Sequence, residues 1–475
     1  METKFVIFYL TFFIGVPAGV VACAVYRPLK HAVMMLMIWA TCVPESTGIN
    51  FLSRESYRTT TRGFEVSLVD LCALIMLVVI LLENNRHRIR WFPPLTIPYA
   101  GYIGVILISW LLVGENPPVP LEAFYIERPF FEVHLYPLFE LSKIIRGCVV
   151  YFIVVNYARD ATAFKVLIAG IGVTVLTTGY LSFADRYIHH VHRVTATLGD
   201  PNSLATYMAI MGATMFGMAL YHQNVFHSAF FGGLAGLAGV SIILTISRGG
   251  LAAYALGLGV IFLTFLHRFF TIKNIAFIAL GALIGVAVFA MAFDTLMSRF
   301  GGDAEADLEY RGLYNEEAVL MAQDHFFGVG IGNFSAYSWD RYARMVDPDL
   351  TPGTPAHHVW YLTLGELGIP GVIAFALIWI RFYQLTLRFI FTRQQGFIIS
   401  VGIACVAATI LNHVQNLLHM SYRQTPMYFM TRLMMGMAVA VWYYQREVKA
   451  QRKAAAEETD LDAVETARAT LGTLR

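Results

Sequence analysis

Residues 293–370 begin FDTLMSRFGG and end HHVWYLTLGELGIP, and they contain the one long polar interruption in an otherwise apolar chain. The polar part, 293–357, carries eleven Asp and Glu residues against four Arg residues. Loops of this length between packed elements are usually either functional or disordered. Because the middle of this loop, from Arg311 to Asp324, has helical periodicity, we predict a small ordered cap over a site at the membrane surface.

The composition of the whole chain indicates its class. Of the 475 residues, 57% are hydrophobic and 14% are charged, whereas a soluble protein averages roughly 25% charged residues. The hydrocarbon core of a bilayer needs runs of about 20 apolar residues, so we predict an all-α, polytopic membrane bundle of about 12–13 transmembrane helices. A large, partly helical periplasmic loop interrupts it. The net charge of +2 does not suggest nucleic acid as a partner.

Thirteen apolar runs are candidate spans, with the residue ranges 5–25, 31–50, 66–82, 96–113, 138–157, 163–181, 202–221, 228–246, 250–267, 274–292, 358–382, 395–415 and 426–444. The second is interrupted by Pro44 and Glu45, so a count of twelve, with the N-terminus on the other side, is the alternative. The predicted units are an N-terminal transmembrane bundle (1–292), the periplasmic loop (293–357), C-terminal transmembrane helices (358–444) and a cytoplasmic tail (445–475).

Lys and Arg residues beside short loops mark the cytoplasmic side of a membrane protein. Such clusters occur at 86–90, 159–165, 267–273, 381–393 and 446–453. The opposite, outer face then receives six polar residues from distant segments: Arg193, Asp200, Asn202, Arg248, Arg311 and His357. Several Arg side chains that converge at a membrane surface need an anionic partner. Lipid-linked phosphates and diphosphates are the class of ligand that fits them.

Two of these positions, Asp200 and Arg248, have two interpretations each, and Arg193 has one. Asp200 followed by Pro201 is typical of a helix N-cap, and the same carboxylate is also a candidate for the site. Arg193 is a candidate for anion contact, because a guanidinium group binds phosphate oxygens in a bidentate fashion and stays charged. Arg248, in the tight turn 247–250, is either an interfacial anchor for a helix end or a phosphate contact.

His357 lies where the polar loop meets the next apolar helix. An imidazole with a reference pKa of about 6.5 can take a proton near neutral pH, so we predict that His357 orients or deprotonates an acceptor group. A capping or interfacial role is the alternative. Tyr361 falls on the same helix face as His357, whereas Glu366 falls on the opposite face and is not expected to pair with it within one helix.

Other patterns have structural interpretations. His189, His190 and His192 have no carboxylate at ligand spacing, so we predict no metal site there. The Gly328–Gly332 turn has no preceding parallel strand, which favours a close-packed turn over a nucleotide-binding loop. The five cysteines lie within or beside apolar runs and are interpreted as buried apolar residues. We predict no metal and no cofactor.

Five short motifs, taken in chain order, resemble the O-antigen ligase/polymerase superfamily. They are Asp200-Pro-Asn202, Ser247-Arg248-Gly249, the loop residue Arg311, the turn Gly328–Phe334, and the string from Pro355 through His357, His358 and Glu366 to Gly371. In this string His358 stands where the superfamily has Asn. Counting back from Glu366 favours His357 over His358 as the acting histidine.

The resemblance implies a metal-independent glycosyltransferase in the bacterial inner membrane, with its site facing the periplasm. The donor would be a glycan linked to undecaprenyl diphosphate. The acceptor would be lipid A–core, as in a ligase, a growing polysaccharide, as in a polymerase, or a protein hydroxyl, as in an O-oligosaccharyltransferase. Catalytic residues would be His357, Arg311 and Arg193, and substrate-binding residues would be Arg248, Asn202, Asp200, Tyr361 and His358.

A non-enzymatic polysaccharide flippase or transporter is the rival class. Such a protein would be expected to place charged residues along a path through the middle of the bilayer. This sequence instead keeps nearly all its charge at the ends of apolar runs, which favours an enzyme with its site at the membrane surface.

Overall fold

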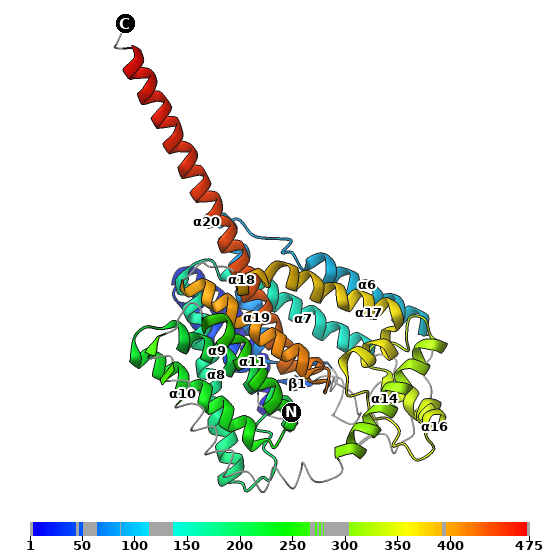
Figure 1. Cartoon of the computed structure of the whole chain (residues 1–475). Coiled ribbons are helices and arrows are strands. Elements are labelled where there is room, and N and C mark those ends of the chain that lie inside the picture. The colour runs from blue at the N-terminus through cyan, green and yellow to red at the C-terminus, as the bar shows by residue number, and fades with distance from the viewer. Residues whose placement is uncertain are drawn as a thin grey trace.

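The computed structural model describes residues 3–43, 47–50, 64–85, 87–113, 136–266, 271–272, 275–276, 279, 304–391 and 396–472. Over these residues the chain is a bundle of long helices (Figure 1) with one short ribbon, in which β1 (Ile49–Asn50) pairs antiparallel with β2 (Glu65–Val66). Eight of the described helices are long and apolar enough to cross a membrane. The prediction of a helical, multi-pass membrane protein is therefore confirmed.

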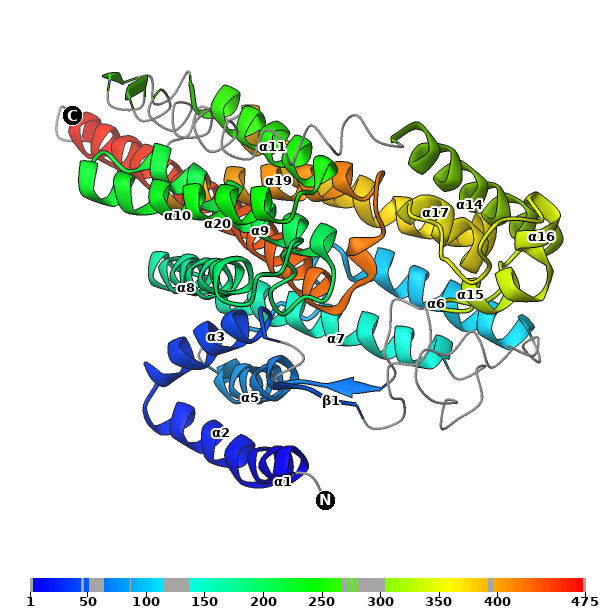
Figure 2. The same ribbon diagram turned by 90° about the horizontal axis from the view of Figure 1, so that it is seen from below.

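The bundle consists of α1 (Thr3–Leu10), α2 (Val16–Val25), α3 (Leu29–Ala40), α5 (Leu68–Leu82), α6 (Thr96–Val113), α7 (Tyr136–Tyr157), α8 (Ala161–Tyr187), α9 (Pro201–Tyr221), α10 (Val225–Leu244), α11 (Arg248–Leu266), α17 (Val359–Thr386), α18 (Arg388–Phe391), α19 (Phe397–Gln415) and α20 (Thr425–Gly472). Shorter turns are η1 (Thr11–Gly15), η2 (Glu83–Asn85) and η6 (Ser421–Arg423). A second group lies at one end of the bundle (Figure 2): α14 (Ala304–Asp324), α15 (Phe334–Tyr337), η5 (Ser338–Tyr342) and α16 (Ala343–Val346). We call residues 304–358 the cap.

The helices follow the predicted spans closely. α6 covers the predicted 96–113, and α9 begins one residue before the predicted 202–221. Four helices differ from a simple span and are not among the eight: α3 and α11 are shorter apolar helices, and α7 and α20 carry charged side chains inside the bundle. The predicted span 274–292 lies outside the described residues apart from isolated positions, so the total of twelve or thirteen stays a prediction.

α9 is the central helix of the bundle, and 94% of its span is buried. Small residues permit this position. A Cβ on Gly212 would lie 2.6 Å from the Cβ of Ala238 on α10, and a Cβ on Gly217 would lie 2.8 Å from that of Ala404 on α19. Helices in a membrane associate through close packing of this kind, because lipid tails are as apolar as the side chains. The N-terminus of α9 is therefore held firmly at the cap end of the bundle.

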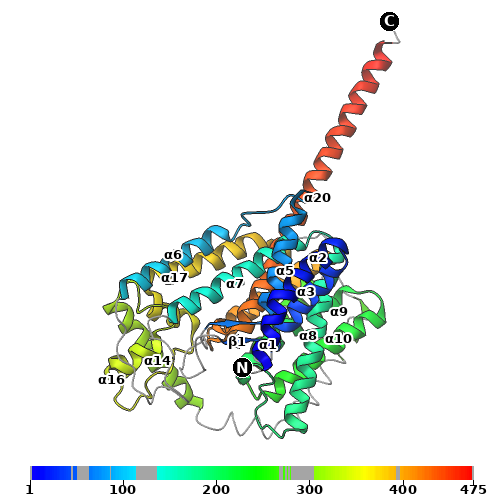
Figure 3. The same ribbon diagram turned by 180° about the vertical axis from the view of Figure 1, so that it is seen from behind.

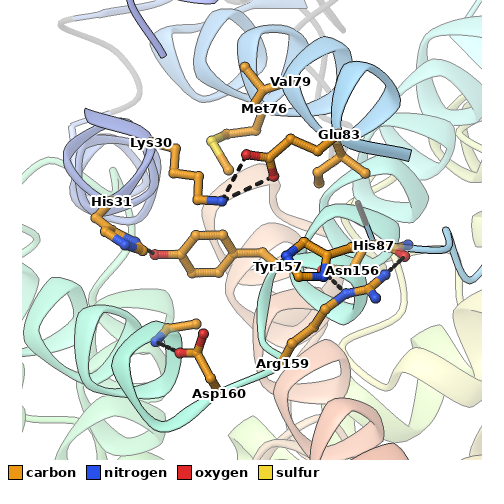
Figure 4. A pocket seen from close by; sticks show the side chains of 12 residues that line it. Lys30, His31, Met76, Val79, Glu83, His87, Asn156, Tyr157, Arg159 and Asp160 are labelled. Carbon is orange, nitrogen blue, oxygen red and sulfur yellow. Dashed lines mark hydrogen bonds and ion pairs between the residues drawn. The ribbon is translucent and has the colours of Figure 1, made fainter. Parts of the chain in front are cut away.

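The end of the bundle opposite the cap is held by polar contacts (Figure 4). Lys30 Nζ donates to both carboxylate oxygens of Glu83 at 3.0 Å, and His31 Nδ1 lies 2.5 Å from the hydroxyl oxygen of Tyr157. These residues line a small cavity between α3, α5 and α7. Because Lys30 and Glu83 neutralise each other, we assign a structural role to this cluster, which holds the three helices together.

α17 breaks at Gly368, whose φ of 64° is left-handed, and Pro370 follows within the same helix. Pro370 has no N–H, so the carbonyl of Glu366 has no helical partner. The glycine turn of the cap supplies one: Gly330 N donates to Glu366 O at 2.8 Å, and the neighbouring Val329 N donates to Gly365 O at 3.0 Å. The turn is thus a close-packed one, which fastens the cap to α17.

Replacing Gly368 by alanine is expected to destabilise the protein by at least about 2 kcal/mol. The added Cβ would lie 1.9 Å from the carbonyl oxygen of Phe326, in a backbone conformation that alanine rarely adopts. Gly312→Ala in α14 is the control, because nothing lies within 4 Å of a Cβ there. Thermal unfolding of both purified variants in one detergent measures the difference, and equal midpoints would contradict the close packing of this turn.

The last helix extends beyond the bundle. α20 runs without a break from Thr425 to Gly472, across the predicted boundary between the last span and the tail at position 445. Figures 1 and 3 show its C-terminal part projecting away from the bundle, on the side opposite the cap. The tail predicted to begin at 445 is therefore, up to Gly472, a helical continuation of the predicted span 426–444.

Candidate functional site

The site is built on the N-terminus of α9. Asp200 is the N-cap residue, and its carboxylate accepts from the backbone N and the hydroxyl of Ser203, both at 2.8 Å. Pro201 occupies the first turn, where its missing N–H costs nothing. The helix N-cap predicted from the Asp-Pro pair is confirmed. It fixes a carboxylate at the N-terminus of the central helix α9, which lies at the same end of the bundle as the cap.

His419 lies against this carboxylate. Its Nε2 is 3.8 Å from Asp200 Oδ2, and the side chain is 7% exposed. The loop between α19 and α20 holds it there, because the carbonyl of Asn416 accepts from Val359 N at 3.1 Å and the Asn416 side chain accepts from Tyr422 N at 2.7 Å. Hydrogen bonds therefore connect the start of α17 to the loop that carries His419.

His357 completes a pair of imidazoles. Its ring centroid lies 5.6 Å from that of His419 in an edge-to-face arrangement, and 6.2 Å from the ring of Tyr314 on α14. The predicted histidine thus sits between the cap helix and the loop of His419, directly before α17 begins. Asp200, His419 and His357 come from three parts of the chain and form one continuous cluster.

Burial and neighbouring positive charge keep both imidazoles neutral at pH 7. Burial, followed by the charge of Arg311, holds the pKa of His357 below its usual value of 6.5. Burial lowers the pKa of His419 to about 4, even though Asp200 acts to raise it. A neutral imidazole has a lone pair that can accept a proton, which an imidazolium lacks.

Arg311 reaches the cluster from α14. Its Nη1 donates to the carbonyl oxygen of Leu418 at 2.9 Å, next to His419 in the α19–α20 loop. Its charge acts on both His357 and His419. A fixed guanidinium therefore lies beside the two imidazoles, where an anionic group could be bound.

The turn between α10 and α11 brings the other predicted arginines to the same end. Arg193 Nε donates to Thr245 O at 3.4 Å, and Ser247 Oγ donates to Asn202 Oδ1 at 2.8 Å, near the start of α9. Arg248 is the first residue of α11. A Cβ on Gly249 would lie 3.7 Å from the Leu418 side chain, so this turn packs against the loop that Arg311 also contacts.

The structure brings most of the predicted site residues together. Asp200, Arg311 and His357 share one cluster, while Arg193, Asn202 and Arg248 lie at the adjoining α10–α11 turn. His358 and Tyr361 pair with each other, with ring centroids 5.0 Å apart. Tyr361, expected on the face of His357, therefore lies beside its neighbour His358.

Behind the site a buried network of charges supports the loop. Arg423 of η6 donates through Nη2 to Glu366 of α17 at 2.7 Å and lies 3.6 Å from Glu140 of α7. Lys143 donates to Glu140 at 2.8 Å and to the carbonyl of Arg423. All four residues are at most 3% exposed. Glu366 is thus engaged by Arg423, in agreement with the prediction that it does not pair with His357.

No group of three or more His, Cys, Asp or Glu side chains that could hold a metal ion occurs in the part of the chain that the structure describes. The histidines at 189, 190 and 192 are among those residues.

His419 is the site residue that sequence reasoning missed. The one available signal was its place in the short segment between the predicted spans 395–415 and 426–444. A lone histidine in such a loop does not reveal that it will be buried, and only the packing of α9, α17 and α19 places it between Asp200 and His357.

No curated protein matches the chain. Residues 233–376 match a protein-family model described as O-antigen ligase. The matched segment includes the α10–α11 turn, Arg311, the glycine turn, His357 and the first part of α17. Asp200 and His419 of the candidate site lie outside it, and the match shows that this segment of the chain is similar to O-antigen ligase.

Proposed function

We propose that the protein transfers a glycan from undecaprenyl diphosphate to an acceptor hydroxyl at the periplasmic face of the bacterial inner membrane. The observation that carries the proposal is the cluster of a neutral, partly buried His357 with Arg311, His419 and Asp200 at one end of an apolar helical bundle. The similarity of residues 233–376 to O-antigen ligase supports a glycosyltransferase that uses a lipid-linked glycan.

Arg311 would bind the donor diphosphate, with Arg193 and Arg248 contributing from the α10–α11 turn. In the reaction, the bond between C1 of the sugar and the phosphate oxygen breaks, and the diphosphate leaves with the electron pair. Negative charge therefore grows on the leaving group in the transition state, and fixed guanidinium groups stabilise that charge selectively. We propose that this positive charge replaces a metal ion.

His357 would accept the proton of the acceptor hydroxyl as its oxygen forms the new bond to C1. Its lowered pKa keeps it in the neutral form that this step requires. His419 would position the His357 ring from the side of Asp200, and Asn202 would hold the α10–α11 turn through Ser247. His358 and Tyr361, on the other flank of the α17 start, would contact the acceptor.

The acceptor is proposed to be lipid A–core, as in a lipopolysaccharide ligase, with a growing polysaccharide as the second candidate. A deletion strain separates the two on a glycolipid gel. Full-length glycan that accumulates on the lipid carrier and is absent from lipid A indicates a ligase. Loss of long chains with single repeats remaining indicates a polymerase.

The test of the reaction uses purified protein in vesicles with a glycan on undecaprenyl diphosphate and lipid A–core as acceptor. Arg311→Ala is expected to lower the transfer rate by about 10²–10³, the usual cost of one donor to a developing negative charge. Arg344→Ala, an exposed arginine of the same cap, is the control and should transfer at the normal rate. Transfer should persist when a chelator is present.

Near-normal transfer by Arg311→Ala would overturn the assignment of this residue. Movement of the glycolipid across the vesicle membrane without a new covalent bond would overturn the enzyme itself and favour a flippase. Loss of transfer on chelation would overturn the proposal that guanidinium charge replaces a metal ion.

A further inference from the structure

A cleft of about 750 Å³ opens between α8 and α10, with the end of α9 and the start of α19 in its lining. It lies at the other end of the bundle from the candidate site. α9 has Asp200 at one end and Tyr221, which lines the cleft, at the other, and 21 helical residues span about 30 Å. The cleft is therefore separate from the cluster around His357.

The cleft is a wedge that closes toward the middle of the bundle. A Cβ on Gly172 of α8 would lie 3.3 Å from Leu234 of α10, and one on Gly179 would lie 2.6 Å from Leu237. On α8 the lining extends from Ala161 through Leu176. The part beyond Lys165 covers about 16 Å along the helix. One leaflet is half of a hydrocarbon core about 30 Å thick, so the wedge has the depth of a single leaflet.

The polar and apolar parts of the lining are separated along this depth. Lys165, His222 and His227 line the cleft near the helix ends, and the rings of the two histidines stack 5.3 Å apart. Deeper along α8 the lining is apolar, and Val173 and Leu176 are 39% and 47% exposed. This is the arrangement that binds an amphiphile with a polar head at the membrane surface and a chain in the bilayer.

We propose that this cleft binds one anionic phospholipid, with its phosphate at Lys165, His222 and His227 and an acyl chain between α8 and α10. The positive charge of Lys165 selects the head group. It attracts a lipid whose head group carries net negative charge, whereas it repels the ammonium of a zwitterionic head group. The volume of the cleft also falls within the range of about 300–1,000 Å³ that is typical of ligand pockets. The proposal does not depend on the glycan-transfer reaction.

The test uses the purified full-length protein, stripped of lipid in detergent and titrated with phosphatidylglycerol or phosphatidylcholine, with bound lipid counted by native mass spectrometry. The wild type is expected to bind one phosphatidylglycerol about fivefold more tightly than phosphatidylcholine, the usual effect of one basic residue at a membrane surface. Lys165→Gln should remove this preference. Arg381→Gln, which removes an exposed charge of α17 outside the cleft lining, should retain it.

A second variant tests the wedge. Ala169 is exposed and lines the cleft, so Ala169→Phe should fill it and weaken the binding of both lipids, while the thermal unfolding midpoint shows that the protein is folded. Equal binding of the two lipids by the wild type, an unchanged preference in Lys165→Gln, or unchanged binding in Ala169→Phe would each overturn the proposal. Competition by millimolar inorganic phosphate would indicate a free-anion site, and preferred binding of a polyprenyl phosphate would indicate a different lipid. Either result would also overturn the proposal.

Discussion

Alanine at position 357 is expected to lower the rate of glycan transfer by about 10²–10⁴, because it removes the group that takes the proton of the acceptor hydroxyl. The neighbouring imidazole cannot replace it. His358 lies on the other flank of the α17 start and pairs with Tyr361. His357 instead faces His419, and the charge of Arg311 lowers its pKa. Transfer by purified His357→Ala and His358→Ala, in vesicles that contain equal amounts of protein, measures the difference.

The pH profile of transfer distinguishes a base from a structural histidine. Burial and Arg311 lower the pKa of His357, so its neutral form persists below pH 6.5 and is lost only in more acidic solution. The rate should therefore be constant around neutral pH and fall on an acidic limb with its midpoint below 6.5. His192→Ala, an exposed loop histidine, is the control for general effects of losing an imidazole. An equal loss in His358→Ala, or an acidic limb that survives in His357→Ala, would contradict the assigned role.

Methionine at position 423 is expected to destabilise the protein by about 3–5 kcal/mol, the usual result of removing one partner from a buried ion pair. Glu366 would lose its donor at 2.7 Å, and Glu140 would lose a positive charge at 3.6 Å, both inside the bundle. The α19–α20 loop, which carries His419, would also lose one of its links to α17. The free energy of unfolding, measured by denaturant titration in one detergent, records the change.

Arg341→Met provides the matched control. Arg341 also pairs with a carboxylate at 2.7 Å, that of Asp324, but the two side chains are 49% and 43% exposed. Water screens such a pair, so its loss should cost less than about 1 kcal/mol. Adding Glu366→Gln to Arg423→Met should recover part of the stability, because the uncompensated charge is then removed. A similar loss of stability in Arg423→Met and Arg341→Met would show that the Arg423 network does not hold the loop.

Much of the fold can be predicted from local sequence, because the membrane acts on short segments. In lipid a run of about 20 apolar residues forms a helix, since only a helix satisfies the backbone hydrogen bonds within a single segment. The bounds of α6 and α9 follow from such runs, and the helix N-cap at Asp200 follows from the adjacent pair Asp200-Pro201. The sequence predicts the glycine turn as a turn. It does not predict that this turn supplies the N–H donors that α17 lacks at the break around Pro370.

By itself, then, the sequence determined the class of protein, the helices and the end of the bundle that carries Arg311 and His357. Only the tertiary structure decided that His419 lies between Asp200 and His357, that Tyr361 turns to His358, and that Glu366 pairs with Arg423. The physical reason is the range of the interactions. A helix is stabilised by contacts within four residues, whereas the site depends on how α9, α14, α17 and the α19–α20 loop pack against one another across most of the chain.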